Sequence, residues 1–334
     1  MAEIAIRADG GSKIGMGHIM RTLVLAKEVS KDNNVFYVCR KDSPISDKYI
    51  SGINKVKSEG FDVKLINENN VLNELMEINA DILITDSYNV NENYFNQTKK
   101  SFKKTGYIDD LNLYYFNVDF IINQNIYAPS LNYNVNKDTK LFLGTEYVML
   151  REEFRNAKMK FIKKTPTDIL ISVGGSDPNN ITLKLIRCLY KLDYIFHIII
   201  GPSFEQISEI ESLASKYSNI RIYKNANMLA LMEKCDISIS GCGSTLYELA
   251  ACGVPTLGII LAQNQEEIAN NINDLNLIDN LDWHNKVANK YLINKLQELA
   301  CDYEKRKSMS RLLMSSINRN GVINIINGIN EYSL

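Results

Sequence analysis

The residues best suited to chemistry lie in a glycine-rich loop near the start of the chain, RADGGSKIGMGH at positions 7–18. A buried strand is predicted to end at Ala8, and His18 stands where the next helix begins. Glycines such as Gly15 and Gly17 allow positive φ angles and let the backbone approach a ligand closely. The positive end of a helix dipole disfavours a charged imidazole, so it should hold His18 neutral, the form that a general base requires. We therefore predict that His18 is a catalytic base; the alternative is a histidine that only caps the helix.

Charged residues on either side of His18 could bind a substrate. Arg21 lies one turn further along the predicted helix and therefore on the same side of it. It could attract an anionic group of a ligand, or it could pair with Asp9, and the sequence leaves both possibilities open. We assign Asp9, Gly15, Gly17 and Arg21 as candidate substrate-binding residues.

Polar residues also follow other predicted strands, where each signal is weak by itself. They are Asp86-Ser87-Tyr88, Asp109-Asp110 and Asn264-Gln265. Each could line the same site, although ordinary turn chemistry explains such residues as well. The three histidines are far apart and no carboxylate cluster has ligand spacing, so we expect no metal site and no cofactor. His197 lies in an apolar strand and is predicted to be a hydrogen-bonded core residue.

A second glycine turn follows a predicted strand in the middle of the chain, VGGSDPNN at positions 173–180. Asp177 is expected to cap the next helix, with Pro178 at the first helical position. A ligand role for Gly174, Gly175 and Ser176 is an additional hypothesis. The turn is not a Walker A loop, because no Gly-Lys-Ser/Thr follows it.

A third glycine turn, GCGSTLYE at positions 241–248, combines several groups that bind nucleotides. Gly243-Ser244-Thr245 opens a helix whose N–H groups and hydroxyls could bind a diphosphate. Glu248, one turn later, could accept both hydroxyls of a ribose; a capping box formed with Thr245 is the alternative. Because these groups occur together at the end of a predicted strand, we favour nucleotide binding. Cys242 has no partner histidine nearby in sequence, so we do not expect it to be a nucleophile.

Short apolar, β-branched runs alternate with helical patterns along the chain, which predicts parallel sheets covered by helices on both faces. Strands are predicted in the first half at Ile4–Ala8, Val35–Cys39, Val63–Ile66, Ile82–Thr85 and Phe120–Ile122, and in the second half at Asp168–Val173, Phe196–Gly201, Ile220–Tyr223, Ile237–Ser240 and Pro255–Ile260. A helix is predicted over Gly17–Lys31. The fold class is therefore α/β, with two doubly wound Rossmann-like domains facing a cleft.

The stretch Arg151–Thr167 is charged, contains few apolar residues and has a proline near its end, so we interpret it as a linker. The predicted scheme is an N-terminal Rossmann-like domain at 1–150 with the histidine loop, a linker at 151–167, and a C-terminal nucleotide-binding Rossmann-like domain at 168–318. Closure of the cleft is expected about the linker.

Composition excludes several classes of protein. The 334 residues include 38 Lys+Arg and 39 Asp+Glu, which gives a net charge of -1. Sequence-independent binding to nucleic acid or to an anionic membrane is therefore not expected, because both need a surplus of basic residues. No apolar run approaches the roughly 20 residues of a membrane span, and the first residues do not form a signal peptide. The six cysteines are scattered without C-x-x-C pairs, so neither a zinc site nor a disulfide frame is indicated. We expect a soluble, cytoplasmic protein with a small-molecule substrate.

Seven stretches carry a family resemblance: RADGGSKIGMGHIMR, ILITDSY, IDDL, LGTEYVMLREEF, ISVGGSDPNN, ISGCGSTLYELAACGVPTL and NQ. In this order they resemble the motifs of the PseG family, the UDP-sugar hydrolases of pseudaminic acid biosynthesis. The spore-coat SpsG proteins share these motifs. The resemblance implies the GT-B architecture of MurG, with a last helix, 319–334, that returns to the N-terminal domain. It also implies hydrolysis of UDP-2,4-diacetamido-2,4,6-trideoxy-β-L-altropyranose at the anomeric carbon, with inversion.

The resemblance also implies roles for individual residues. His18 would activate water, and Tyr88, Asn264 and Gln265 would lie on the sugar side. UDP would be held by Gly243, Ser244, Thr245 and Glu248, with Gly174, Gly175 and Ser176 closing over the phosphates. Two positions depart from the family pattern: Cys242 stands where a small residue is usual, and Asn320-Gly321 stands where the family tends to have Asp-Gly.

Two other functions use the same loops. A GT-B glycosyltransferase would pass the sugar from UDP to an acceptor, and a nucleotide-sugar binding protein would keep the UDP loops without a catalytic base. A transferase of the MurG kind would carry a membrane-facing patch on its N-terminal domain. The basic stretch Lys99–Lys104 is better interpreted as a solvated helix face.

Overall fold

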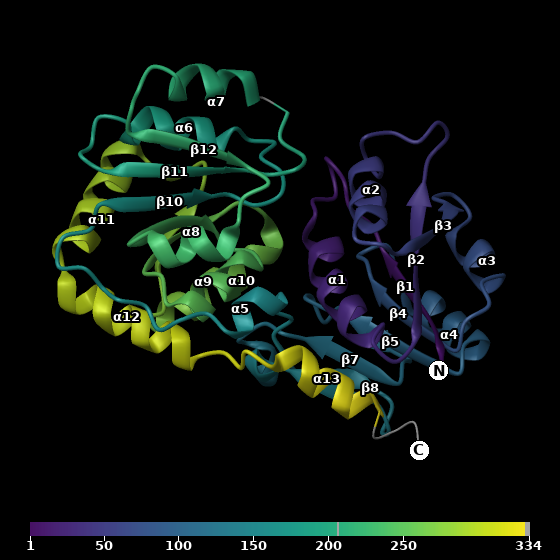
Figure 1. Cartoon of the computed structure of the whole chain (residues 1–334). Helices are drawn as coiled ribbons and strands as arrows, with labels where there is room; N and C mark the ends of the chain where they lie inside the picture. Colours follow the sequence, from purple (N-terminus) through teal and green to yellow (C-terminus); the bar gives the residue numbers. More distant parts are fainter. Residues whose placement is uncertain (206, 331–334) are drawn as a thin grey trace. The chain divides into compact units, whose positions relative to one another are not determined.

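The computed structural model describes residues 1–205 and 207–330, which form two compact units (Figure 1). Unit 1 contains Met1–Leu150 together with the segment that starts at Asn320, and unit 2 contains Arg151–Arg319. Each unit has its own parallel β-sheet. Residues 331–334, which belong to the predicted last helix, lie outside the described residues.

Unit 1 is built on a seven-stranded parallel sheet in the order β3-β2-β1-β4-β5-β7-β9. The strands are β1 (Glu3–Ala8), β2 (Asn34–Lys41), β3 (Asp62–Asn67), β4 (Ile82–Asp86), β5 (Lys104–Ile108), β7 (Phe120–Asn123) and β9 (Lys140–Leu143). All five strands predicted for the first half are present, whereas β5 and β9 were missed. A separate short pair consists of β6 (Tyr115–Phe116) and β8 (Asn134–Val135).

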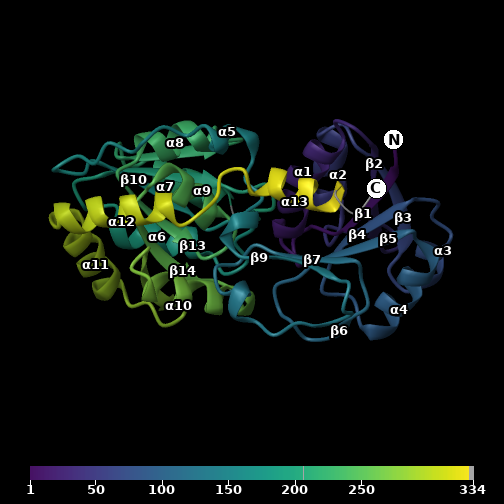
Figure 2. The same ribbon diagram turned by 90° about the horizontal axis from the view of Figure 1, so that it is seen from below.

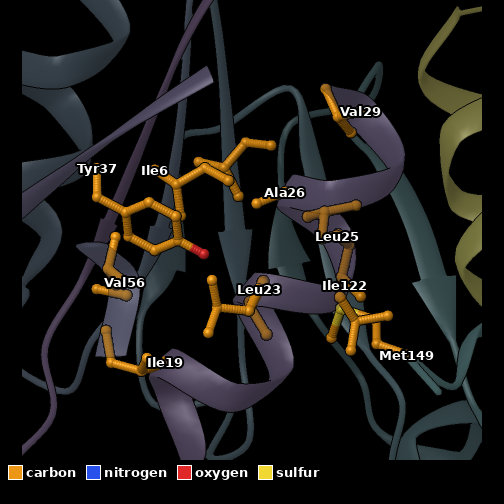
Figure 3. Close-up of a cluster of buried hydrophobic side chains, with 14 of the residues drawn as sticks. Ile6, Ile19, Leu23, Leu25, Ala26, Val29, Tyr37, Val56, Ile122 and Met149 are labelled. Atoms are coloured by element: carbon orange, nitrogen blue, oxygen red, sulfur yellow. The ribbon is translucent and has the colours of Figure 1, made fainter. Parts of the chain in front are cut away.

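Helices cover both faces of this sheet. They are α1 (Gly17–Val29), α2 (Ile50–Ser58), α3 (Val71–Met76), α4 (Glu92–Ser101) and α13 (Gly321–Asn330), with 3-10 turns at η1 (Ala128–Ser130) and η2 (Thr145–Tyr147). On one face Ile6 of β1 packs in a core cluster with Ile19 and Leu23 of α1 (Figure 3). Its neighbour Ala5 belongs to a second cluster with Phe95 of α4. Successive strand residues point to opposite faces, so each strand contributes to both cores.

The basic stretch Lys99–Lys104 does not form one solvated helix face. It covers the end of α4 and the first residue of β5, and Phe102 within it is buried in the core. The prediction was therefore wrong about the element, because a buried aromatic residue and a strand start interrupt the helix.

The helix α13 completes the core of unit 1. Val322 and Ile325 are fully buried in the same cluster as α1, and α13 lies beside α1 in Figure 2. The helix begins at Gly321, where a Cβ would lie 2.4 Å from the backbone nitrogen of Val148. Glycine allows this close approach between two backbones.

Unit 2 is built on a six-stranded parallel sheet in the order β12-β11-β10-β13-β14-β15. The strands are β10 (Asp168–Ser172), β11 (Ile195–Ile200), β12 (Ile220–Lys224), β13 (Ile237–Gly241), β14 (Thr256–Ile260) and β15 (Asp279–Trp283). The five predicted strands are confirmed. The edge strand β15 was missed because its sequence, DNLDW, is mostly polar.

The helices of unit 2 are α5 (Glu152–Arg155), α6 (Ile181–Leu189), α7 (Ile207–Ala214), α8 (Met228–Lys234), α9 (Thr245–Cys252), α10 (Glu266–Asp274), α11 (Asn289–Cys301) and α12 (Tyr303–Ser315), with a 3-10 turn at η3 (Gln263–Gln265). The stretch for which a linker is predicted starts with α5, which packs against α9. Further along this stretch, Lys160 Nζ donates to the carbonyls of Met232 and Glu233 at the end of α8, at 2.8 and 2.7 Å. Among the described residues, no helix is long and apolar enough to cross a lipid bilayer.

Candidate functional site

The strand order of unit 1 brings together two of the loops for which a role in chemistry is predicted. It reverses between β1 and β4, which are neighbours with Ala8 paired to Asp86. Doubly wound sheets bind ligands outside the carboxyl ends of the strands at such a point. His18 follows β1 through the glycine loop, and Asp86 is the last residue of β4. The topology therefore places these two side chains at the same edge of the sheet.

Glycines determine the shape of the loop between β1 and α1. The backbone groups of Gly11 and Gly15 bond to each other at 3.1 and 2.9 Å, which closes the loop into a tight turn. Gly15 has a φ of +80°, a conformation that glycine adopts without strain. A Cβ on Gly11 would lie 2.1 Å from the carbonyl oxygen of Lys48, so close packing requires this glycine. Apart from the adjacent backbone, nothing lies within 4 Å of a Cβ position on Gly15 or Gly17, so both remain candidate substrate-binding residues.

His18 is the second residue of α1, at the helix N-terminus as predicted, and only 9% of its side chain is exposed. Its Nδ1 lies 2.5 Å from Oδ1 of Asp86. Because an ionised carboxylate only accepts hydrogen bonds, Nδ1 carries the hydrogen, and Nε2 of the neutral ring keeps its lone pair. The pair thus has the arrangement of a general base oriented by a buried carboxylate.

Arg21 binds the same carboxylate from its other side. Its Nε donates to Oδ2 of Asp86 and its Nη2 to Oδ1, both at 2.6 Å. Its Nη1 donates to Oδ1 of Asp110 at 2.8 Å. All three nitrogens therefore bind carboxylates, and the geometry gives Arg21 the role of holding Asp86 in place.

The pairing of Arg21 with Asp9, one of the two possibilities that the sequence left open, is not found. Asp9 is 2% exposed and accepts two hydrogen bonds from Arg40, from the backbone nitrogen and from Nε, both at 2.7 Å. Sequence proximity suggested Arg21 as the partner, but β2 lies directly beside β1 and brings Arg40 to Asp9. A substrate contact of Asp9 stays a prediction that its geometry does not favour.

Asp86 is a fully buried anion. Burial by itself opposes ionisation, but the charges and hydrogen bonds of Arg21 and His18 outweigh it and lower the pKa of this carboxyl to about 2. Asp86 therefore stays charged at neutral pH and can stabilise a protonated His18 electrostatically.

Tyr88 is held next to the histidine by Asp110. Its hydroxyl donates to Oδ2 of Asp110 at 2.8 Å, and its ring meets the His18 ring edge-on, with centroids 4.7 Å apart. Asp110 also accepts a hydrogen bond from Nδ2 of Asn125 at 3.1 Å. Burial opposes ionisation of Asp110, but Arg21 outweighs it and lowers the pKa. The weak signals at Asp86, Tyr88 and Asp110 thus belong to one network with His18.

Unit 2 has its own switch point, between β10 and β13. The turn after β10 contains Gly174, whose φ is +116°. A Cβ on Gly201, just after β11, would lie 2.5 Å from the carbonyl oxygens of Gly174 and Gly175, so this position needs glycine too. The turn is therefore packed tightly onto the neighbouring strand end, which fixes its backbone.

The helix after this turn begins later than predicted. Asp177 accepts the backbone N–H groups of Ile181 and Thr182, both at 2.8 Å, so its capping role is confirmed. However, α6 begins at Ile181 with Asn180 as its N-cap, so Pro178 at the first helical position was wrong. The physical reason is an extra turn between Asp177 and the helix, with Asn180 in the left-handed conformation at a φ of 52°.

The start of α9 does not form a capping box. The helix begins at Thr245, and its N-cap Ser244 makes no side-chain capping hydrogen bond. Glu248 instead accepts a hydrogen bond from Nε of Arg151 at 2.8 Å. Burial raises the pKa of Glu248, although the charge and hydrogen bond of Arg151 oppose this shift. The structural alternative for Glu248 is therefore wrong, while its role toward a ribose stays a prediction.

Gln265 and Cys242 both lie near the third glycine turn. Asn264 and Gln265 follow β14, and Nε2 of Gln265 lies 3.5 Å from where a Cβ on Gly243 would be. Gln265 therefore borders the third glycine turn. Cys242 is buried, and burial raises its thiol pKa to about 12, which agrees with the expectation that it is not a nucleophile.

Other polar residues have structural roles. His197 is fully buried, with Nε2 2.8 Å from Oδ1 of Asp168 and Nδ1 2.9 Å from the Tyr223 hydroxyl, so it is the satisfied core residue that was predicted. Asn125 gave no sequence signal and was missed as a partner of Asp110, and Arg151, although it lies in the quoted stretch LGTEYVMLREEF, was not predicted as a partner of Glu248. The described residues contain no group of three His, Cys, Asp or Glu side chains that could hold a metal ion.

Two Rossmann-like units, each with a glycine turn at the switch point of its parallel sheet, are typical of the GT-B class. The structure resembles the solved structure of Acinetobacter baumannii MurG with a TM-score of 0.67 and 14% sequence identity, covering 98% of this chain and 99% of that one. Residues 169–322 match the glycosyltransferase family 28 C-terminal domain. The predicted α/β fold class is confirmed.

Comparison of sequences gives more particular relatives and confirms the resemblance noted in the motifs. The UDP-2,4-diacetamido-2,4,6-trideoxy-β-L-altropyranose hydrolase of Campylobacter jejuni is 27% identical over 80% of this chain and 94% of the relative. The spore coat polysaccharide biosynthesis protein SpsG of Bacillus subtilis is 23% identical over 97% of this chain and 96% of the relative. An uncharacterized protein of Methanocaldococcus jannaschii is 31% identical over 79% of this chain, which spans only 56% of that relative.

Proposed function

We propose that the chain is a nucleotide-sugar hydrolase that releases UDP from UDP-2,4-diacetamido-2,4,6-trideoxy-β-L-altropyranose. It would serve pseudaminic acid or related surface or spore-coat polysaccharide biosynthesis, in the cytoplasm, where nucleotide sugars are made. The observation that carries the proposal is the His18–Asp86 pair at 2.5 Å, fixed by Arg21. A protein that only binds its ligand has no need of a buried, oriented base. The relative from Campylobacter jejuni, named for this reaction, supports the choice of substrate.

The proposed reaction needs one base and one leaving group. Nε2 of His18 takes a proton from water while the water oxygen bonds to the anomeric carbon. The bond between that carbon and the β-phosphate oxygen breaks, and its electron pair leaves with UDP. Attack from the face opposite UDP inverts the configuration. The charge of Asp86 stabilises the imidazolium that forms, which then loses its proton to solvent.

Unit 2 is proposed to bind the UDP part. The N-terminal N–H groups of α9 and the turn at 174–176 offer donors for phosphate oxygens, as helix N-termini do for anions in general. These donors would stabilise the negative charge that develops on the leaving diphosphate, so a strong general acid is not required. Asn264 and Gln265 are proposed to complete this site from the turn after β14, and Glu248 to bind the ribose.

The decisive experiment measures UDP release in water without acceptor, in the presence of EDTA, from the diacetamido-altrose nucleotide and from UDP-GlcNAc. Release from the first substrate, lost by about 10²–10⁴-fold in His18→Ala, is expected for the loss of a general base. His284→Ala is the matched control, because this histidine lies in unit 2 outside both networks. In ¹⁸O-water the label should enter the free sugar, whereas label in UDP would contradict attack at the anomeric carbon.

A GT-B glycosyltransferase is the second candidate, because the MurG-like fold and the family 28 domain suit it equally well. UDP binding without release in water, followed by release when an acceptor is added, would favour this function. Turnover retained by His18→Ala would contradict a base-dependent reaction, and binding without any turnover would indicate a nucleotide-sugar binding protein.

A further inference from the structure

Contacts with Glu248, Glu153 and Phe154 hold the side chain of Arg151 in unit 2. Its Nε donates to Oε1 of Glu248 at 2.8 Å, and its Nη1 lies 2.9 Å from Oε1 of Glu153. The guanidinium also lies over the ring of Phe154, 4.8 Å from its centre, and that ring is fully buried. Phe154 belongs to α5, which packs against α9. The arginine is therefore held in one orientation against the helix that carries Glu248.

The charged form of Glu248 is stabilised by Arg151. Its side chain is 18% exposed, and both burial and the nearby charge of Glu153 disfavour its charged form. Arg151 opposes both effects with its charge and its hydrogen bond. The hydrogen bond takes Oε1, while none of the described residues donates a hydrogen bond to Oε2. One carboxylate oxygen is thus anchored and the other can accept from a ligand.

We propose that Arg151 is a positioning residue that anchors the Glu248 carboxylate and aims it at the vicinal hydroxyls of the nucleoside, which makes the site select ribonucleotides over 2′-deoxyribonucleotides. This inference rests on the proposed UDP site of unit 2. It gives a function to a residue in the stretch for which only a linker is predicted. A guanidinium is suited to this task because its donors are rigid and it keeps its charge at any physiological pH.

The test compares the dissociation constants of UDP and 2′-deoxy-UDP by calorimetry. Hydrogen bonds to a charged group contribute about 1.5–3 kcal/mol, so the wild-type chain should bind UDP about 10–100 times more tightly than 2′-deoxy-UDP. Arg151→Met keeps the aliphatic stem over Phe154 but removes the donors. It should raise the dissociation constant of UDP by about 10-fold and that of 2′-deoxy-UDP by less than about 3-fold, so that the preference for UDP over 2′-deoxy-UDP becomes smaller.

Further variants separate positioning from folding. Arg151→Lys should retain part of the preference, because it keeps the charge without the planar donors. Glu248→Gln should lose the preference, and adding Arg151→Met to it should change the preference no further. Arg187→Met is the matched control, because Arg187 forms an exposed ion pair with Glu209 elsewhere in unit 2. Circular dichroism checks that each variant is folded. If Arg151→Met does not fold, the comparison of UDP with 2′-deoxy-UDP is made with Arg151→Lys instead.

The outcomes are distinguishable. Equal weakening of both nucleotides in Arg151→Met would overturn the proposal, because it would show that Arg151 only stabilises α9. A wild-type chain that binds both nucleotides equally would overturn the ribose role of Glu248 while leaving UDP binding intact. A wild-type chain that binds neither would overturn the proposed function itself.

Discussion

Replacing Asp86 by asparagine tests the proposed catalytic network with the smallest change in shape. In the wild-type chain this carboxylate accepts a hydrogen bond from His18 at 2.5 Å and two from Arg21 at 2.6 Å. An asparagine has no charge to stabilise the imidazolium. It can also present its amide hydrogens to Nδ1, which would move the ring hydrogen to Nε2 and remove the lone pair that takes the proton from water.

The expected magnitude follows from these two losses. In comparable histidine–aspartate pairs this change lowers kcat by up to about 10⁴-fold, so we expect a loss of about 10²–10⁴-fold, or about 3–5 kcal/mol of activation free energy. Arg21 would keep its contact with Asp110, so the variant should fold, with a loss of about 1–3 kcal/mol in the free energy of unfolding. The UDP dissociation constant should not change, because the proposed UDP site lies in unit 2.

The assay is UDP release at saturating substrate, with urea unfolding and UDP calorimetry on the same samples. Asp32→Asn is the control, because Asp32 is an exposed aspartate of unit 1. A folded Asp86→Asn chain with kcat within about 3-fold of wild type would refute the catalytic pairing, since general-base catalysis contributes at least about 10²-fold. A parallel loss of UDP binding would show instead that the variant perturbs more than this network.

Three further results are expected. Because the pKa of Asp86 is lowered from 3.8 to about 2 in the folded chain, its ionisation stabilises the fold above pH 4, and about 2 kcal/mol is lost as the pH falls from 4 to 2. Acid unfolding curves should show this loss in the wild-type chain and not in Asp86→Asn; identical curves would contradict it. Tyr88→Phe removes the hydrogen bond to Asp110 but keeps the ring, so kcat/KM should fall by about 2- to 10-fold. A loss of kcat/KM above about 100-fold would mean that the hydroxyl acts on the substrate directly. Gly201→Ala would place a methyl group 2.5 Å from the carbonyl oxygens of residues 174–175. It should therefore lower the free energy of unfolding by about 1–3 kcal/mol and weaken UDP binding. An unchanged unfolding curve would refute this packing argument.

The sequence was sufficient for most of the buried strands and for the glycine turns that follow them. Buried strands such as β1 and β10 have continuous apolar runs, and each is followed by a glycine turn that the sequence makes visible. Strand β5 could not be recognised in the same way, because Lys104 and Gly106 interrupt its pattern. Gly106 is there for a tertiary reason: a Cβ would lie 2.0 Å from the ring of Phe120 on the neighbouring strand.

The partners of the charged residues could not be predicted, because they depend on which strands are neighbours. Arg21 and Asp9 are close in sequence, yet Arg21 binds Asp86 and Asp110, which lie 65 and 89 residues away from it. Arg151 was missed for the same reason, since its partner Glu248 is 97 residues further along the chain. A pattern along the sequence shows which groups are present, while the strand order decides which of them meet.

The position of α13 has a consequence for how the chain is made. Val322 and Ile325 of α13 fill part of the core of unit 1, and the other fully buried residues of that cluster all come before position 151, while unit 2 is continuous in sequence. During synthesis, unit 2 is therefore complete before unit 1 is. At ribosomal rates of about 5–20 residues per second, the first unit waits roughly 10–35 s with part of its apolar core uncovered. In that interval the nascent N-terminal half is the part of the chain that a chaperone would bind.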